Sequence, residues 1–314
     1  MKKETTGSDE KPSKRSKNRN LYDPGIFWKK ALEQIHKKYL EKGIKDFRSD
    51  SLNLNFFVPT YGCPGNTFDN SFVEKIQKIC KRDYGHRQLK EVETRFDGSR
   101  DAYADYRAFK IASNFNDPLG LLKFSESKIG SPAEHFNFDG SWFSRSSLNY
   151  LLGLSFLFSV YPKFRPKRVL EIGGGFGTLA EILGKSNLIN LHYLNLDLNP
   201  MFLIAKDYVT ECFIRDKRLS VTDQIPKKEF SINELKTFSF FPNSKIEYLN
   251  GTIDLFVNFI SFQEMEPEIV KNYVNNVQRL KPKLILIRNL REGKQIQKGN
   301  ILGVKTPILK ENYL

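Results

Sequence analysis

The stretch RVLEIGGGFGTLAEIL, residues 168–183, decides the fold of this chain. A short apolar run leads into four glycines within five positions, and a segment with the apolar spacing of a helix follows. Glycine lets a backbone turn sharply and lets a ligand approach without a Cβ in between. A helix that starts after such a turn offers free N–H groups and a partial positive charge. The stretch therefore predicts a buried strand, a ligand-binding loop and a helix.

From residue 167 onward, β-branched apolar runs alternate with amphipathic segments. The predicted strands are 168–172, 191–197, 253–260 and 283–289, with 238–241 as the candidate for one more. The predicted helices are 178–185, 201–210 and 267–280. This alternation predicts an α/β fold with helices on both faces of a parallel sheet. Ligands of such sheets bind at the carboxyl ends of the strands.

The preceding part of the chain, residues 21–160, has a mainly helical pattern. Helices are predicted at 27–43, 72–85, 101–115 and 144–161, with a Pro- and Gly-rich loop at 55–66. The polar and aromatic stretch 126–143 lacks helical spacing, which predicts a surface loop that faces a ligand. We therefore expect a substrate-binding or lid region at 21–160 and a ligand-binding domain at 161–314.

The net charge of +14 is compatible with nucleic acid or another anionic partner. Residues 1–20 carry seven basic and three acidic side chains and so supply +4 of this net charge. Their composition predicts a disordered basic tail. This tail has no apolar stretch that would make it a secretory signal. The longest apolar run, 150–161, is short against the roughly 20 residues that cross a bilayer. We expect a cytoplasmic protein without a membrane span.

The cysteines and histidines are scattered along the sequence. Their spacing matches neither a disulfide framework nor a metal site; the residues are Cys63, Cys80 and Cys212, and His36, His86, His135 and His192. We therefore expect no bound metal.

The glycines follow an acid in the order acid-x-Gly-x-Gly-x-Gly, at Glu171, Gly173, Gly175 and Gly177. A second acid, Asp197, ends the next predicted strand. This order resembles the first motif of class I S-adenosylmethionine-dependent methyltransferases, in which the loop holds the amino acid end of the cofactor. The resemblance implies that the second acid binds both ribose hydroxyls. The implied cofactor-binding residues are Glu171, Gly173, Gly174, Gly175, Phe176, Gly177, Asp197 and Asn258. Alternatively, Asp197 is only a charge near the N-terminus of the next helix.

Two further stretches narrow the resemblance: ESKIGSP at 126–132 and NFISFQEM at 258–265. Together with the helical leader and the glycine motif, they are similar to sugar O-methyltransferases of bacterial surface-polysaccharide clusters, over Phe27–Arg291. This implies a Rossmann-like class I methyltransferase sheet, S-adenosyl-L-methionine as cofactor, and a hydroxyl of a sugar, nucleotide-sugar or glycan as acceptor. Class I sheets end with two further strands. Only one strand-like piece, 301–309, follows here, so we expect C-terminal strands to be missing.

Two residues are candidates for the general base that a sugar hydroxyl needs, a contribution of about 10²–10⁴-fold. Glu264 follows the fourth predicted strand, and His135 lies in the 126–143 loop and titrates near neutral pH. The alternatives are a helix-start charge for Glu264 and a plain surface histidine. Asn258 either binds the sugar or caps the backbone at the strand end, and Trp142 and Phe143 either stack on the sugar or pack in the core.

Three rival functions remain open at this point. An RNA-binding methyltransferase would use the positive charge, but residues 258–261 lack the Asn/Asp-Pro-Pro-aromatic turn that holds a flipped base. No RNA-binding module is recognisable, so no nucleic-acid partner is expected. A non-catalytic relic of the fold would fit the short C-terminal part. A nicotinamide oxidoreductase is disfavoured by Thr178, which stands where the dinucleotide fingerprint needs its third glycine. The oligomeric state stays open.

Overall fold

The computed structural model describes residues 21–57, 70–114, 117–222, 224–299 and 303–313. The predicted basic tail, residues 1–20, lies outside the described residues, as do residues 58–66 of the predicted loop at 55–66. Residues 55–57 of that loop instead end the helix α2 (Ser51–Phe57).

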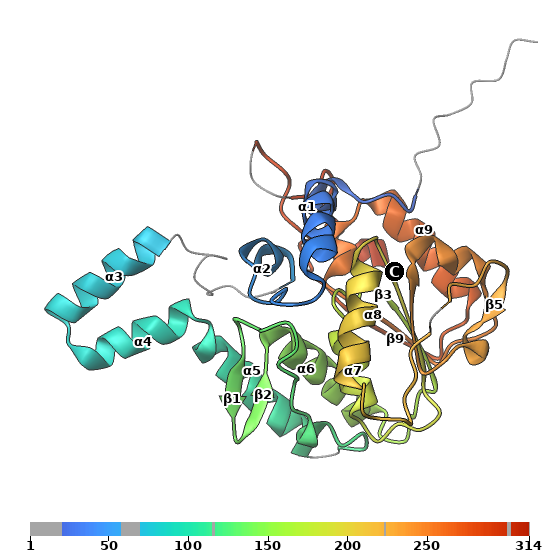
Figure 1. The fold of residues 1–314 in the computed structure, drawn as a ribbon, viewed down its shortest axis with the longest axis horizontal. Coiled ribbons are helices and arrows are strands. Elements are labelled where there is room, and N and C mark those ends of the chain that lie inside the picture. The colour runs from blue at the N-terminus through green and yellow to red at the C-terminus, as the bar shows by residue number, and fades with distance from the viewer. Residues whose placement is uncertain (1–20, 58–69, 115–116, 223, 300–302, 314) are drawn as a thin grey trace, which may run out of the picture.

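A five-stranded parallel sheet forms the centre of the molecule (Figure 1). Its strands are β3 (Arg168–Ile172), β4 (His192–Asp197), β6 (Phe238–Pro242), β8 (Leu255–Phe259) and β9 (Leu284–Arg288). They lie in the order β6-β4-β3-β8-β9, so the first, second, third, fourth and fifth strands of the sheet are arranged as 3-2-1-4-5. The registers pair Val169 with Tyr193 and with Leu255, all in parallel. The predicted Rossmann-like α/β class is confirmed, including the strand proposed at 238–241.

Alternating side chains of the strands build two apolar layers, because successive residues of a strand point to opposite faces. Val169, Tyr193 and Leu255 belong to one core cluster, which continues into helices α5 to α8. Leu170, Leu194 and Phe256 belong to the other, which includes side chains of α9 (Pro267–Arg279). Helices α7 (Thr178–Gly184) and α8 (Met201–Cys212) follow the first two strands, as predicted. Each face of the sheet is therefore covered.

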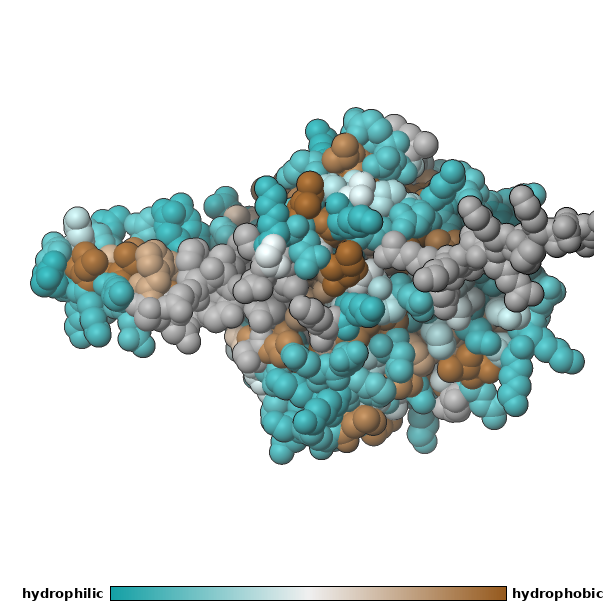
Figure 2. Space-filling view, turned by 90° about the horizontal axis from the view of Figure 1, so that it is seen from above, coloured by the Kyte–Doolittle hydropathy of each residue, from teal (hydrophilic) through white to brown (hydrophobic). Residues whose placement is uncertain are grey.

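The leader contains helices α1 (Ile26–Lys42), α2 (Ser51–Phe57), α3 (Asn70–Asp83), α4 (His86–Phe96), α5 (Ser99–Asn114) and α6 (Arg145–Val160). Helices α1, α3, α5 and α6 match the predicted segments, and Ser144 closes the N-terminus of α6 with a capping box. The α3–α4 hairpin extends away from the sheet (Figure 1). Apolar side chains are visible on this hairpin from above (Figure 2). Phe72 and Ile79 of α3 are 47% and 42% exposed.

The stretch 126–143 differs from the predicted surface loop. It holds a small antiparallel hairpin of β1 (Phe136–Phe138) and β2 (Ser141–Phe143), and it buries Glu126 and Glu134. Phe143 belongs to the core cluster that spans the leader helices and the sheet. Trp142 stacks on His135, with ring centroids 4.9 Å apart. Of the two interpretations of Trp142 and Phe143, sugar stacking or core packing, core packing is correct for Phe143.

The segment after β9 turns back toward the rest of the molecule. In the described part of the chain, β9 is an edge of the sheet, and its Ile285 is 52% exposed. Of the predicted strand-like piece 301–309, residues 301–302 lie outside the described residues, and Val304 makes an isolated bridge with Ile296. Ile308 is fully buried in the cluster that contains α9. The segment is thus a packed arm, held further by Glu266, which accepts the backbone N–H groups of Lys305 and Thr306.

Candidate active site

A cavity opens at the carboxyl edge of the sheet, where β3, β4 and β8 end. Its volume is about 560 Å³, including open solvent at its mouth. The walls come from the ends of β3 and β4, from the segment after β8, from the start of α1 and from α9. The lining residues are Asp23, Pro24, Gly25, Trp28, Ile172, Gly173, Gly175, Leu196, Asp197, Leu198, Met201, Asn243, Glu264, Met265, Ile269 and Tyr273. The order in which the strands follow one another reverses between β3 and β8, and such a switch point is the usual ligand position in parallel sheets.

Gly173 and Gly175, from the glycine loop at residues 173–177, line this cavity with bare backbone. Gly173 has a φ of +70°, and a Cβ there would lie 2.3 Å from the Ser261 hydroxyl oxygen. Gly174 donates its N–H to Asn195 Oδ1 at 3.1 Å, and its Cβ would lie 2.4 Å from Glu171 Oε2. The loop is therefore packed from below by polar side chains, so any larger residue would push it toward the ligand space.

Glu171, one of the predicted cofactor-binding residues, lies beneath the loop and does not line the cavity. Its carboxylate is fully buried and accepts the hydroxyls of Tyr150, at 2.7 Å, and Tyr193. Burial raises the pKa of Glu171 to about 7, and the two tyrosine hydroxyls counteract that rise. The motif acid thus supports the loop from inside the core.

Asp197 lies in the cavity at the end of β4, as predicted. Its Oδ2 accepts the backbone N–H of Gly175 at 3.0 Å, and its Oδ1 accepts that of Leu198 at 2.7 Å. Burial raises the pKa of Asp197 to about 7, with a further upward contribution from the negative charge of Glu264. Each carboxylate oxygen keeps a second lone pair, which can accept a ligand hydroxyl.

Glu264 lines the same cavity from η4 (Ser261–Glu264), the short 3₁₀ helix after β8. Its Oε2 accepts the indole N–H of Trp28 at 3.2 Å, and its Oε1 is 2.9 Å from the Lys294 ammonium. Burial raises the pKa of Glu264, while Lys294 and Trp28 act in the opposite direction. A buried carboxylate with raised pKa beside a cavity has the properties of a general base. Neither Trp28 nor Lys294 was predicted, since both lie far from Glu264 in sequence.

The end of β8 is held by the other polar residues of the NFISFQEM stretch. Asn258 is fully buried, donates to the Ile172 carbonyl at 2.9 Å and accepts the Phe262 N–H at 3.2 Å. It does not line the cavity, and these two hydrogen bonds are the ones expected of a residue that caps backbone at the strand end. Ile260 has a φ of +69°, which is unfavourable for a β-branched residue. This backbone strain marks the turn that brings Glu264 to the cavity.

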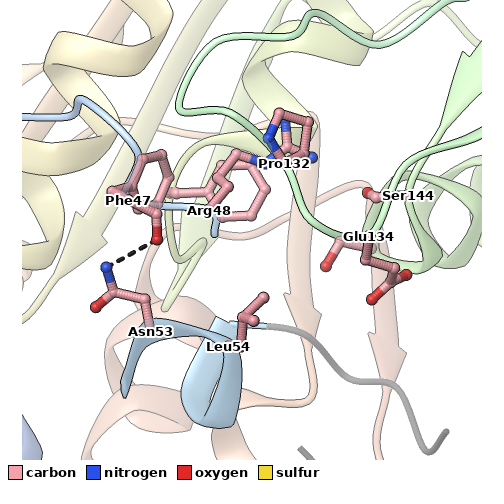
Figure 3. A pocket seen from close by; sticks show the side chains of 9 residues that line it. Phe47, Arg48, Asn53, Leu54, Pro132, Glu134 and Ser144 are labelled. Carbon is pink, nitrogen blue, oxygen red and sulfur yellow. Dashed lines mark hydrogen bonds between the residues drawn. The ribbon is translucent and has the colours of Figure 1, made fainter. Parts of the chain in front are cut away.

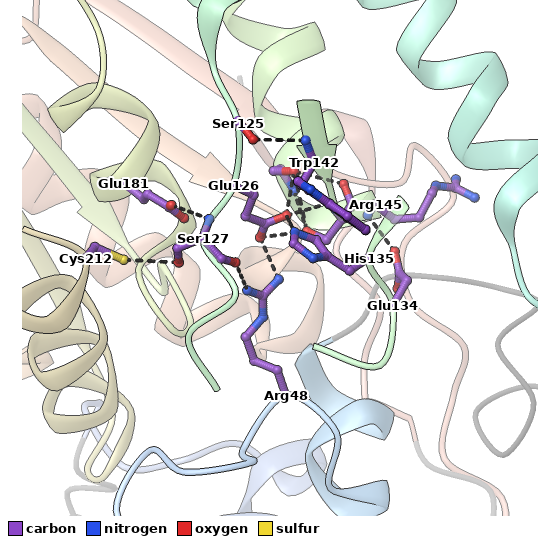
Figure 4. A network of polar contacts seen from close by, with 12 residues as sticks. Arg48, Ser125, Glu126, Ser127, Glu134, His135, Trp142, Arg145, Glu181 and Cys212 are labelled. Atoms are coloured by element: carbon purple, nitrogen blue, oxygen red, sulfur yellow. Dashed lines mark hydrogen bonds and ion pairs between the residues drawn. The ribbon is translucent and has the colours of Figure 1, made fainter. Parts of the chain in front are cut away.

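His135, the other predicted base, is not among the residues that line this cavity. Its imidazole lies against Trp142, 3.8 Å from Glu126 Oε2, in a buried polar network (Figure 4). Burial, helped by the positive charge of Arg48, lowers the pKa of His135 to about 4, so the ring is neutral at physiological pH. The stretch 126–143 therefore does not meet the end of β8 above the glycine loop.

A second cavity, with a volume of about 300 Å³ that includes open solvent, is lined by residues of the leader and by Phe176 (Figure 3). Phe176 lines this cavity and not the first one, so its predicted contact with a cofactor is not supported by the geometry. The remaining lining residues are Phe47, Arg48, Asn53, Leu54, Pro132, Glu134, Ser144 and Ser146. Gly177 begins α7 with a φ of +99°, and its Cβ would lie 2.9 Å from the Val209 side chain, so its role is packing.

Two properties of the described residues bear on other classes of function. None of the described helices is both long and apolar enough to cross a membrane. Among the same residues, no group of three or more His, Cys, Asp or Glu side chains is placed to hold a metal ion.

Comparison with known proteins gives only distant likenesses. No protein-family model matches the chain, and no curated protein matches it. Among solved structures, the methyltransferase domain of bacterial CtHen1 aligns with a TM-score of 0.30 and 14% identity, over 43% of this chain and 63% of its own. The mitomycin 7-O-methyltransferase MmcR aligns with 0.30 and 11%, over 83% and 50%. The mycolic acid cyclopropane synthase CmaA1, complexed with SAH, aligns with 0.29 and 14%, over 59% and 55%. The chain thus spans about half to under two thirds of the length of these proteins, at low similarity.

Proposed function

We propose that this protein is an S-adenosyl-L-methionine-dependent methyltransferase. The observation that carries the proposal is the meeting of Gly173, Gly175 and Asp197 in one cavity at the carboxyl edge of the sheet. Backbone without side chains lies where the strand turns into a helix, and a carboxylate with two acceptor oxygens ends the neighbouring strand. A nucleoside with two adjacent ribose hydroxyls matches that carboxylate, and the cofactor's amino acid end matches the bare loop.

The residues present fit this cofactor better than a dinucleotide. A pyrophosphate-binding loop uses a third glycine for close packing between helix and strand. Thr178 occupies that position and is buried, so the first turn of α7 lacks this glycine. Asp197 and Glu264 also place two carboxylates in the cavity, which favours a ligand with positive charge over a diphosphate.

For the acceptor we propose a hydroxyl group, with Glu264 as the residue that takes its proton. When bound, S-adenosyl-L-methionine supplies a methyl group that is already activated by its sulfonium. The protein then has to align the acceptor oxygen and exclude water. Trp28 and Lys294 fix the carboxylate of Glu264 in one orientation, each through one of its oxygens. A sugar, nucleotide-sugar or glycan is the acceptor class implied by the NFISFQEM and ESKIGSP stretches, and the indole beside Glu264 suits a sugar face.

Calorimetry tests the cofactor assignment directly. Wild-type protein should bind S-adenosylmethionine and S-adenosylhomocysteine, and the isosteric Asp197→Asn variant should bind both at least tenfold more weakly. Gly175→Val, at a φ of +60°, should abolish binding; circular dichroism establishes whether this variant is folded. A folded wild-type protein without affinity for either compound would refute the proposal.

Transfer of a labelled methyl group tests the acceptor. The protein is incubated with labelled S-adenosylmethionine and, in parallel, with nucleotide-sugars, glycan precursors and RNA. If a sugar acquires the label with wild-type protein but not with the Glu264→Gln variant, the result supports a sugar hydroxyl as the acceptor. Label in RNA would transfer the assignment to the nucleic-acid alternative, and cofactor binding without any transfer would favour a non-catalytic relic.

A further inference from the structure

A buried arginine connects the helical leader to the glycine loop. Arg48 lies between α1 and α2 and is 6% exposed. Its guanidinium carbon is 4.8 Å from the ring centroid of Phe176 and 5.8 Å from that of Tyr208. Phe176 belongs to the glycine loop, and Tyr208 belongs to α8. A residue of the leader therefore rests directly on the loop that we assign to the cofactor.

The other side of the Arg48 guanidinium is anchored to the stretch that follows residue 125 (Figure 4). Its Nη2 donates to Glu126 Oε1 at 2.6 Å, and its Nη1 donates to the Ser127 carbonyl at 3.3 Å. Glu126 is itself immobilised, because it accepts the hydroxyls of Ser144 and Ser147, each at 3.0 Å, at the start of α6. The arginine is thus held in a fixed plane by a carboxylate that cannot move.

Phe176 needs such a support because the backbone on both sides of it is permissive. Gly175 and Gly177 have φ values of +60° and +99°, a region that glycine populates readily. Phe176 is 5% exposed, and together with Arg48 it lines the second cavity, whose volume of about 300 Å³ includes open solvent. Phe47 packs against the ring edge-on at 5.4 Å. The fixed guanidinium limits how far the ring can move into that cavity.

We propose that Arg48 is a positioning residue that holds Phe176, and through it the backbone of Gly175, in the conformation that binds the cofactor. The inference rests on the proposed function. Gly175 precedes Phe176 directly and donates its N–H to Asp197, the predicted ribose-binding carboxylate. A shift of the Phe176 ring would therefore move the backbone N–H that holds this carboxylate. The ESKIGSP stretch acquires a physical role in this arrangement, because its first residue, Glu126, orients the arginine.

Three variants test this positioning role. Arg48→Met alone leaves Glu126 buried without its cation, which destabilises the fold. The neutral double variant Arg48→Met/Glu126→Gln avoids that problem. Arg48→Lys keeps the charge but loses the planar group that stacks on the ring. The matched control is Arg168→Met/Asp254→Asn, which removes an ion pair of 2.8 Å at the opposite end of β3.

The double variant should bind S-adenosylhomocysteine at least tenfold more weakly than wild type. Arg48→Lys should bind it at least threefold more weakly. The control should change the affinity less than twofold. In a Phe176→Leu background, the added Arg48→Met/Glu126→Gln change should weaken binding less than twofold, because the ring through which Arg48 acts is gone. An equal loss in both backgrounds, or no loss at all, overturns the role of Arg48.

Hydrogen exchange gives a readout that needs no ligand. The amides of the glycine loop should exchange at least fivefold faster in the double variant than in wild type or in the control. Unchanged exchange in the loop overturns the positioning role. If wild-type protein binds neither cofactor nor product, the proposed function fails, and this exchange experiment still decides whether Arg48 orders the loop.

Discussion

Trp28 and Glu264 lie 236 residues apart in the sequence and meet through a hydrogen bond of 3.2 Å from the indole N–H to the carboxylate. The bond joins the first helix to the turn after β8, directly at the edge of the cavity that contains the glycine loop. Lys294 approaches the other carboxylate oxygen from the segment after β9. Three distant parts of the chain therefore fix one acidic side chain in place, which is the geometry that an oriented general base requires.

Glu264→Gln should lower turnover at least tenfold and leave cofactor affinity unchanged. The amide keeps the shape of the side chain but removes the group that takes the acceptor proton. Glu266→Gln is the matched control, because Glu266 is equally buried yet binds backbone N–H groups of Lys305 and Thr306 and does not line the cavity. Steady-state kinetics decides the matter: equal turnover losses in the two variants would mean that Glu264 is only structural.

The sheet was predictable from the sequence because its strands are short apolar runs with few competing patterns. Val169–Ile172 and Phe238–Phe241 are buried on both faces, and each segment is apolar except for one residue, Glu171 in the first and Ser239 in the second. Helix α4 was missed although Leu89, Val92 and Phe96 follow a helical spacing. None of its side chains is buried, so its pattern is that of a partly solvated helix rather than of a core helix.

The site was only partly predictable, because periodicity says nothing about contacts between distant segments. Gly173, Gly175, Asp197 and Glu264 were found from their places after strands, since the carboxyl ends of parallel strands meet at one edge. Arg48 and Glu126 form a buried pair 78 residues apart, and His135 lies 3.8 Å from the same carboxylate, a contact that no local sequence pattern indicates. The position of Glu171 beneath the loop was not predictable for a related reason: the tyrosines that enclose it come from α6 and β4.

Lys294→Met should move the pH dependence of turnover to higher pH. Burial favours the protonated form of Glu264, while the Lys294 ammonium favours the ionised form, so removal of the ammonium raises the pKa of Glu264 further. The ionised carboxylate is the active base, and the acidic limb of the kcat profile should therefore rise at a higher pH than in wild type. Lys294→Arg should restore the wild-type profile. Trp28 and Asp197, the other groups that act on this carboxylate, are unchanged in both variants. An unshifted limb in Lys294→Met would contradict the base assignment.

Cofactor affinity should increase as the pH rises through about 7, the pKa to which burial raises Asp197. The ionised carboxylate accepts two ribose hydroxyls, whereas the protonated form must donate from one oxygen, so binding requires loss of the proton. Calorimetry with S-adenosylhomocysteine between pH 5.5 and 8.5 measures the effect. Asp197→Asn should flatten the profile. Glu171→Gln is the control for the other carboxyl group with a pKa of about 7, and it should retain the slope, because Glu171 does not line the cavity.

The same carboxyl group should make the ligand-free protein less stable at alkaline pH. Asp197 has a pKa of about 7 in the folded state against an ordinary value of 3.8. A raised acid pKa means that the folded state retains the proton longer than the unfolded state, so its contribution to stability is complete below pH 4 and is lost as the pH rises through 7. Between pH 5 and pH 8, this loss amounts to about 2–3 kcal/mol.

Urea unfolding, followed by circular dichroism at both pH values, should show a fall in unfolding free energy that is larger by that amount in wild type than in Asp197→Asn. Saturating S-adenosylhomocysteine should reduce the difference, because a ligand bound to the ionised carboxylate stabilises the folded state at high pH. An identical pH dependence in the two proteins would mean that Asp197 is ionised throughout this range and that the cavity is more polar than its lining indicates.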